Sequence, residues 1–159
     1  MQIDLSCQMK KSILMLGAGQ EQCIAINEAK SLGYHVIACD TNASAPGLEL
    51  CDVGVVIDIR DVSRLIKIGQ QHKISGVFCH AVEIPDVVAE VAEALRLPGL
   101  SPHTARLCTR KDSRIQALRR ANIPVAEFIS VANRDEVTKI QPNFGFPLVL
   151  KPIDRKSTR

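Results

Sequence analysis

The sequence predicts an α/β fold: a doubly wound, Rossmann-like parallel sheet, followed by the beginning of an α+β domain. Short continuous apolar segments alternate with amphipathic helical patterns as far as about residue 100, which is typical of a parallel sheet covered by helices. Beyond that point the hydrophobic periodicity and the sign of the charge both change. A chain of 159 residues, 46% of them hydrophobic and 3% aromatic, can bury a core of Val, Ile, Leu and Ala side chains.

The first predicted unit is a strand, a glycine turn, a helix and a second strand. Residues 12–16 form a continuous apolar strand, and residues 17–20 turn the chain into a helix over residues 21–32. A second strand over residues 35–39 ends at Asp40. A βαβ unit of this length is expected to cross over in the right-handed sense.

Two further strands complete the predicted sheet. Residues 53–57 form the third strand and residues 76–79 the fourth, with a helix between them that Asp61 caps. A helix opened by Pro85 then runs until Pro98 ends it. We expect these elements to close a first domain over residues 12–105, after a leader of residues 1–11.

The pattern that follows predicts the start of a second domain, over residues 106–159. From residue 102 onward the expected elements are two helices, a strand, a third helix and a strand that presents Lys151, over residues 102–108, 112–121, 127–131, 134–140 and 148–150, so the first of these helices crosses the predicted boundary. Pro147 and Pro152 bound the last strand, because proline restricts the residue before it to extended geometry and removes a backbone donor. A lysine fixed at the end of a buried strand is a suitable point charge for a phosphate group.

Charge separates the two predicted domains. Up to residue 100 the chain has 8 basic and 12 acidic side chains, a net −4, and beyond it 12 basic and 5 acidic, a net +7. The positive part suits a polyanionic ligand. Because aromatic side chains do not accompany the basic residues, we expect no nucleic-acid partner.

Cysteine spacing and hydropathy argue against several classes of protein. The six cysteines form no C-x-x-C pair, so the sequence spells out neither a zinc site nor a redox motif, and most are expected to be small core side chains. No apolar segment approaches the roughly 20 residues that span a bilayer. The leader lacks the features of a secretory signal. We therefore expect a cytoplasmic protein with no membrane partner.

Gly17 and Gly19, together with Asp40, match the beginning of a dinucleotide-binding fingerprint. In that fingerprint a third glycine allows close packing of helix and strand, and this sequence has Gln22 in its place. An NAD-dependent Rossmann enzyme is therefore an alternative prediction. His80, at the end of the fourth strand, is expected to be structural, because no nucleophile or partner carboxylate accompanies it.

Three motifs beyond residue 100 resemble the ATP-grasp ligase superfamily, which includes biotin carboxylase and carbamoyl-phosphate synthetase. They are Arg110-Lys111-Asp112, Asn122-Ile123-Pro124-Val125-Ala126 and Gly145-Phe146-Pro147-x-Val149-x-Lys151-Pro152. The resemblance implies a pre-ATP-grasp domain over residues 12–105 and the start of the ATP-grasp domain over residues 106–159. The later half of the family has no counterpart here, so the magnesium-binding carboxylates and the catalytic residues are expected to lie outside this sequence.

The resemblance also implies roles for six residues. Two of them would bind ATP: Lys111 and Lys151. Four would help to form the acceptor-substrate site at the carboxyl edge of the sheet: Gly17, Gly19, Gln20 and Glu83. With ATP and magnesium, the complete enzyme would phosphorylate a small carboxylate substrate and let an amine or a thiol displace the phosphate. No catalytic residue and no metal ligand is assigned, and we expect this chain to be inactive by itself.

Two alternatives stay open from the sequence: a non-catalytic module that binds a nucleotide or a small ligand, and the NAD-dependent enzyme. A homodimer is left open as well. If ATP binds, Lys151 is expected to contribute more than Lys111, because a strand and a proline hold it.

Overall fold

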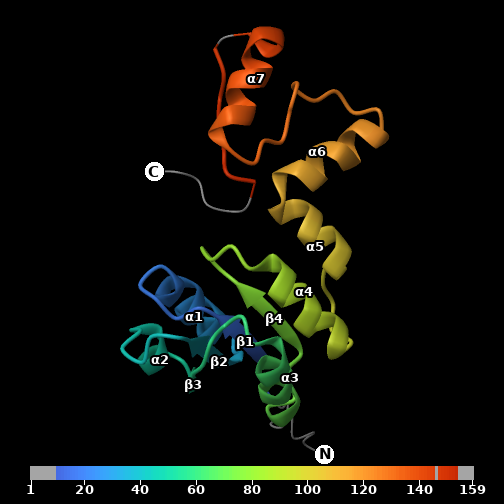
Figure 1. Cartoon of the computed structure of the whole chain (residues 1–159). Helices are drawn as coiled ribbons and strands as arrows, with labels where there is room; N and C mark the ends of the chain where they lie inside the picture. The colour runs from blue at the N-terminus through green and yellow to red at the C-terminus, as the bar shows by residue number, and fades with distance from the viewer. Residues whose placement is uncertain (1–9, 146, 154–159) are drawn as a thin grey trace, which may run out of the picture. The chain divides into compact units, whose positions relative to one another are not determined.

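The computed structural model describes residues 10–145 and 147–153 and divides into two compact units. Unit 1 is Met1–Ala105 and unit 2 is Arg106–Arg159. Most of the predicted leader lies outside the described residues. Figure 1 shows the parallel strands of unit 1 and the helices of unit 2.

Unit 1 is built on a four-stranded parallel sheet. Its strands are β1 (Ser12–Leu16), β2 (His35–Asp40), β3 (Val53–Val56) and β4 (Gly76–Cys79), in the order β3-β2-β1-β4. The central strand β1 pairs with β2 on one side and with β4 on the other, so that Leu14 is the register partner of both Ile37 and Val77. The α/β fold class predicted from the alternation of strands and helices is confirmed.

Helices cover both faces of this sheet (Figure 1). They are α1 (Gln22–Ser31), α2 (Gly47–Leu50), α3 (Val62–Gln71) and α4 (Pro85–Ala94). Successive residues of a strand point to opposite faces, and β1 shows the result. Leu14 and Leu16 are buried in one cluster with Leu65 of α3, whereas Met15 is buried in a second cluster with Ile26 of α1. The continuous apolar pattern of β1 is therefore the pattern of a strand covered on both sides.

The order of the strands changes direction between β1 and β4. The chain proceeds from β1 to β2 and β3 on one side and then returns to the other side of β1 as β4. Ligands of open α/β sheets bind outside the carboxyl ends of the strands at such a switch point. Here the switch point lies between the loop that follows β1, residues 17–21, and the loop that follows β4, residues 80–84.

The helices predicted for the region beyond residue 100 are confirmed. They are α5 (Pro102–Thr109), α6 (Lys111–Arg120) and α7 (Arg134–Phe144). The last of these continues beyond its predicted end at residue 140. It ends at Phe144, three residues before Pro147.

The two strands predicted in unit 2 are wrong. Residues 127–131 and 148–150 are not paired into a sheet, and no strand occurs among the described residues of this unit. Val149 is 79% exposed and Leu150 is 72% exposed, so their segment is not the buried strand that its apolar pattern indicated. An extended apolar segment becomes a strand only when a neighbour pairs its backbone, and even a two-stranded piece is marginal in water.

Candidate functional site

The loop after β1 carries three of the four residues predicted to contact the acceptor substrate. Gly17 is buried and has a φ of +99°, a conformation that glycine adopts at little cost. Its N–H donates to the carbonyl of Cys39 at 2.8 Å, which fixes the start of the loop to the end of β2. Gly19 is half-buried and Gln20 is exposed. The loop therefore presents Gln20 at the switch point of the sheet.

Asp40, the acidic residue of the incomplete dinucleotide fingerprint, is engaged within the protein. Its Oδ2 accepts a hydrogen bond from the N–H of Ala18 at 2.7 Å, and its Oδ1 accepts one from the N–H of Asn42 at 2.8 Å. In a dinucleotide enzyme the corresponding carboxylate binds the ribose hydroxyl group. Here, both oxygens of Asp40 organise loops of this chain.

The loop after β4 carries the fourth predicted residue, Glu83, which is exposed. His80 begins this loop, and its side chain is also exposed, whereas its backbone carbonyl accepts a hydrogen bond from Gln22 Nε2 at 2.6 Å. This bond is made by the backbone and not by the imidazole, so it does not support the predicted structural role of the His80 side chain. The loops of Gln20 and Glu83 follow β1 and β4, which are adjacent and parallel, so both loops lie at the carboxyl edge of the sheet.

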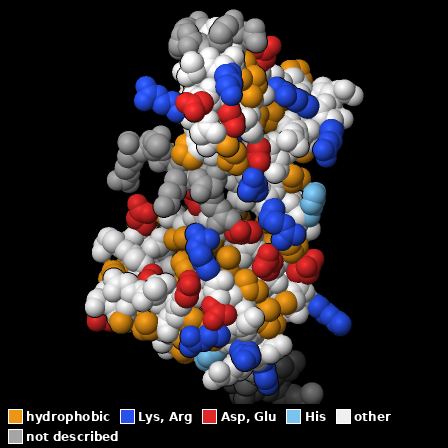
Figure 2. Space-filling view, in the orientation of Figure 1, with side chains coloured by type: hydrophobic (Ala, Val, Ile, Leu, Met, Phe, Trp, Pro, Cys, Tyr) orange, Lys and Arg blue, Asp and Glu red, His pale blue; other side chains and the backbone are white. Residues whose placement is uncertain are grey.

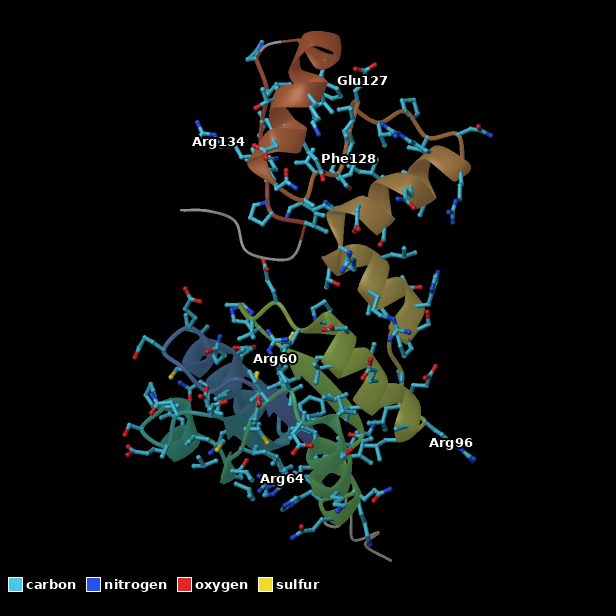
Figure 3. All side chains as sticks on the ribbon, in the orientation of Figure 1. Arg60, Arg64, Arg96, Glu127, Phe128 and Arg134 are labelled. Atoms are coloured by element: carbon cyan, nitrogen blue, oxygen red, sulfur yellow. The ribbon has the colours of Figure 1, made fainter. Side chains whose placement is uncertain are left out.

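Unit 2 contains a groove with a volume of about 1160 Å³. It is lined by α6, α7 and the two extended segments that follow these helices. Its larger apolar side chains include Ile115, Phe128, Ile140 and Leu148, and its cationic side chains are Arg110, Lys111, Arg114, Arg134 and Lys151. Figure 2 shows hydrophobic side chains lying between Lys and Arg side chains on the surface of unit 2. Figure 3 labels Phe128 on the segment between α6 and α7.

The two lysines predicted to bind ATP both line this groove. A backbone hydrogen bond helps to explain why residues so distant in sequence meet there: the N–H of Lys111 donates to the carbonyl of Ile153 at 3.2 Å. Lys111 is half-buried at the start of α6, whereas Lys151 is exposed on an extended segment. The expectation that a strand holds Lys151 is therefore wrong, and Lys111 is the more constrained of the two.

Arg110 and Asp112 form a bidentate ion pair at the start of α6. Arg110 Nε donates to Asp112 Oδ1 at 3.2 Å, and Arg110 Nη2 donates to Oδ2 at 2.8 Å. These bonds, together with the N–H of Ser113, lower the pKa of Asp112 from 3.8 to about 2. The motif that contains both residues was apparent in the sequence, but the pairing of Arg110 with Asp112 was not predicted.

Replacing Arg110 by alanine is expected to raise the pKa of Asp112 towards 3.8, because the largest cause of its depression is removed. The folded-state pKa is depressed, so the pair stabilises the fold above the ordinary value of 3.8 and this contribution is lost as the pH falls through about 2. An NMR titration of the Asp112 carboxyl carbon measures the shift. Arg119→Ala, at the other end of α6, is the control and should leave the pKa unchanged. An Arg110→Ala variant that titrates like the parent would contradict the assignment.

No metal site is apparent in the part of the chain that the structure describes, and two of its cysteine thiols have raised pKa values. No group of three or more His, Cys, Asp or Glu side chains in residues 10–145 and 147–153 could hold a metal ion. Burial raises the pKa of the Cys39 thiol to about 12, and burial also raises the pKa of Cys51. Burial thus disfavours the thiolate form of both side chains.

No helix in the described ranges is sufficiently long and apolar to cross a membrane.

Curated relatives match nearly the whole chain. A formate-dependent phosphoribosylglycinamide formyltransferase from Prochlorococcus marinus subsp. pastoris is 33% identical over 156 residues, which cover 90% of this chain and 37% of the relative. The chain thus spans little more than a third of the length of this relative. No family model matches the chain.

Solved structures share the fold. Phosphoribosylglycinamide synthetase from Anaerococcus prevotii is 27% identical with a TM-score of 0.71, over 92% of this chain and 39% of that one. N5-carboxyaminoimidazole synthetase from Staphylococcus aureus, solved with ADP, is 20% identical with a TM-score of 0.66, over 83% and 35%. The biotin carboxylase domain of a single-chain bacterial carboxylase is 19% identical with a TM-score of 0.66, over 92% and 37%. The last two likenesses concern the fold alone.

Proposed function

We propose that this chain, which resembles the amino-terminal part of ATP-grasp ligases in sequence and in fold, forms part of an ATP-dependent carboxylate-amine or carboxylate-thiol ligase. Unit 1 would supply the acceptor-substrate domain, and unit 2 would be the start of the ATP-binding domain. The complete enzyme would phosphorylate a small carboxylate and let the nucleophile displace phosphate from the acyl phosphate. We also place the protein in the cytoplasm as part of this proposal.

The observation that carries the proposal is the groove of unit 2. A nucleotide combines an apolar base with a polyanionic phosphate chain, and binding sites for such ligands join apolar walls to a few placed polar groups. The groove offers both, because Phe128 and Ile140 are among its apolar side chains while Lys111 and Lys151 supply positive charge. A solved structure that shares the fold was obtained with ADP.

The two lysines would act by electrostatic positioning. An ammonium group is a compact point charge that is suited to a phosphate oxygen, and it needs no proton transfer to stabilise a bound nucleotide. Arg110 also lines the groove, but its guanidinium already forms two bonds to Asp112. We therefore assign the nucleotide to the lysines and give Arg110 the role of organising the start of α6.

The acceptor substrate would bind at the switch point of unit 1. Gly17, Gly19, Gln20 and Glu83 lie in the two loops that meet there. A relative is named for formate and phosphoribosylglycinamide, which suggests a small carboxylate and an amine as the two substrates of this protein as well. ATP-grasp chemistry also uses magnesium, but the described residues offer no cluster of ligands for it, so no step is assigned to that ion.

Isothermal titration of ATP into the chain tests the nucleotide site. Lys111→Met and Lys151→Met keep the length of the side chain and remove its charge, and each is expected to weaken binding roughly ten-fold or more, as for the loss of a charge-assisted hydrogen bond. Lys111→Met should cost at least as much affinity as Lys151→Met, because the half-buried Lys111 loses less freedom on binding.

Lys139→Met is the matched control, since Lys139 is exposed on α7 and does not line the groove. It should bind ATP as the parent does. If the parent and both groove variants bind ATP with equal affinity, the assignment of the nucleotide to Lys111 and Lys151 is wrong.

A further inference from the structure

Among the described residues, Gln22 is the one polar residue that is buried. It is 6% exposed and begins α1. A carboxamide removed from water costs free energy unless it forms hydrogen bonds. Its Nε2 donates to the carbonyl of His80 at 2.6 Å, across 58 residues of sequence. The buried carboxamide therefore joins α1 to the loop that follows β4.

The two glycines of the β1–α1 loop make room for this connection. A Cβ atom added to Gly19 would lie 2.9 Å from Gln22 Oε1, and one added to Gly17 would lie 3.4 Å from Gln22 Cγ. The Cβ atom at Gly17 would also lie 3.1 Å from Val82 Cγ2. In a dinucleotide fingerprint the glycines let a pyrophosphate approach the backbone. Here they accommodate side chains of the protein itself.

The loop after β4 is held on both sides of Glu83. Val82 packs against Gly17, and Ile84 is 0% exposed in the core of unit 1. The N–H of Ile84 donates to the carbonyl of Val82 at 3.0 Å, so the loop is tight around Glu83. Glu83 itself is exposed. Val82 thus links the position of Glu83 to the β1–α1 loop, and Ile84 links it to the core.

We infer that Gln22 is a positioning residue whose carboxamide ties the β1–α1 loop to the loop after β4 and so fixes Glu83 relative to Gln20. The consequence for substrate rests on the proposed function, which assigns Gln20 and Glu83 to the acceptor site. By filling the inside of the turn, the same side chain closes it to a dinucleotide pyrophosphate.

Amide hydrogen exchange on the full chain, without ligand, tests the inference. Gln22→Met keeps a similar length and apolar volume but removes the donor to His80. The Ile84 amide is expected to exchange roughly two- to twelve-fold faster than in the parent, which corresponds to the net loss of one hydrogen bond. The amides of β2 should be unchanged. Gln71→Met, the same substitution at an exposed position of α3, is the control and should exchange like the parent.

A second variant separates hydrogen bonding from space filling. Gln22→Glu keeps the shape, and once ionised its carboxylate cannot donate and would repel the His80 carbonyl. At a pH at which this carboxyl group is ionised, Ile84 should lose more protection than in Gln22→Met. Parent-like exchange of Ile84 in Gln22→Met would overturn the inference. Equal loss of protection across β1, β2 and β4 would also overturn it, because Gln22 would then support the whole core. Since no ligand is used, neither result depends on the ATP titration.

Discussion

Replacing Ile26 with alanine is expected to lower the free energy of unfolding of unit 1 by about 2–5 kcal/mol, the usual cost of truncating a fully buried isoleucine. Ile24→Ala, two residues earlier on α1, should change it by no more than about 0.5 kcal/mol. Ile26 is 0% exposed, whereas Ile24 is 75% exposed. The same chemical change on one helix therefore isolates burial as the variable.

The environment of Ile26 leaves little opportunity to fill the space that truncation creates. It packs in a cluster with Met15 and Val36 of the sheet, and its Cδ1 would lie 2.7 Å from a Cβ atom on Gly47. Protein interiors are close-packed, so a cavity at such a position persists and its walls lose dispersion contacts. A typical domain is stable by about 5–15 kcal/mol, so the loss is a large share of the total.

Urea unfolding followed by circular dichroism at the helical band measures both variants, since the chain has no tryptophan to report by fluorescence. The midpoint should fall clearly for Ile26→Ala and remain close to that of the parent for Ile24→Ala. Similar midpoints for the two variants would contradict the packing of α1 described above.

A second large effect is expected in the exchange rates of backbone amides in the two units. Amides of Leu14, Leu16 and Val77 should be protected roughly a thousand-fold or more relative to those of residues 148–151, because cooperative unfolding of a stable sheet limits the former. β1 lies between two partner strands. Residues 148–150, in contrast, do not pair with any strand among the described residues, and the side chains of Val149 and Leu150 are largely exposed.

Exchange detected by NMR or mass spectrometry distinguishes the two cases. If residues 148–151 exchange as slowly as β1, then they are stabilised by contacts that the structure does not contain, and unit 2 is folded as cooperatively as unit 1. The Ile26→Ala variant offers an internal check, because it should raise the rates in β1 and β2 and leave those of residues 148–151 unchanged.

The family resemblance required only the linear sequence. The motifs around Lys111 and Lys151 indicated ATP-grasp ligases, and the likeness is confirmed by a relative that is 33% identical and by solved structures with the same fold. The roles of individual residues in binding remain proposals that the titrations above address.

The sequence by itself determined the four strands of unit 1 and its helices α1, α3 and α4, whereas the short helix α2 falls in a segment whose Asn, Ser, Pro and Gly residues had indicated a loop. A strand covered on both faces is expected to be apolar, as Ser12–Leu16 nearly is. Asp61 caps α3, because its Oδ1 accepts a hydrogen bond from the N–H of Arg64 at 3.1 Å. These signals are local, so they can be interpreted without knowing the rest of the structure. The carboxyl edge of the sheet, and hence the loops of Gln20 and Glu83, followed from the same pattern.

Only the tertiary structure decided which residues that are distant in sequence contact each other. Residues 148–150 have a strand-like pattern, but pairing depends on a neighbour that local sequence does not reveal. In the sequence, Gln22 stands where a glycine fingerprint requires a third glycine. Its hydrogen bond is apparent only in the folded chain, where its Nε2 lies 2.6 Å from the carbonyl oxygen of His80. The groove that joins Lys111 and Lys151 likewise depends on a backbone bond between residues 111 and 153. Hydrogen bonds and packing across such separations are set by the folded chain, because no local periodicity encodes which partner will be adjacent.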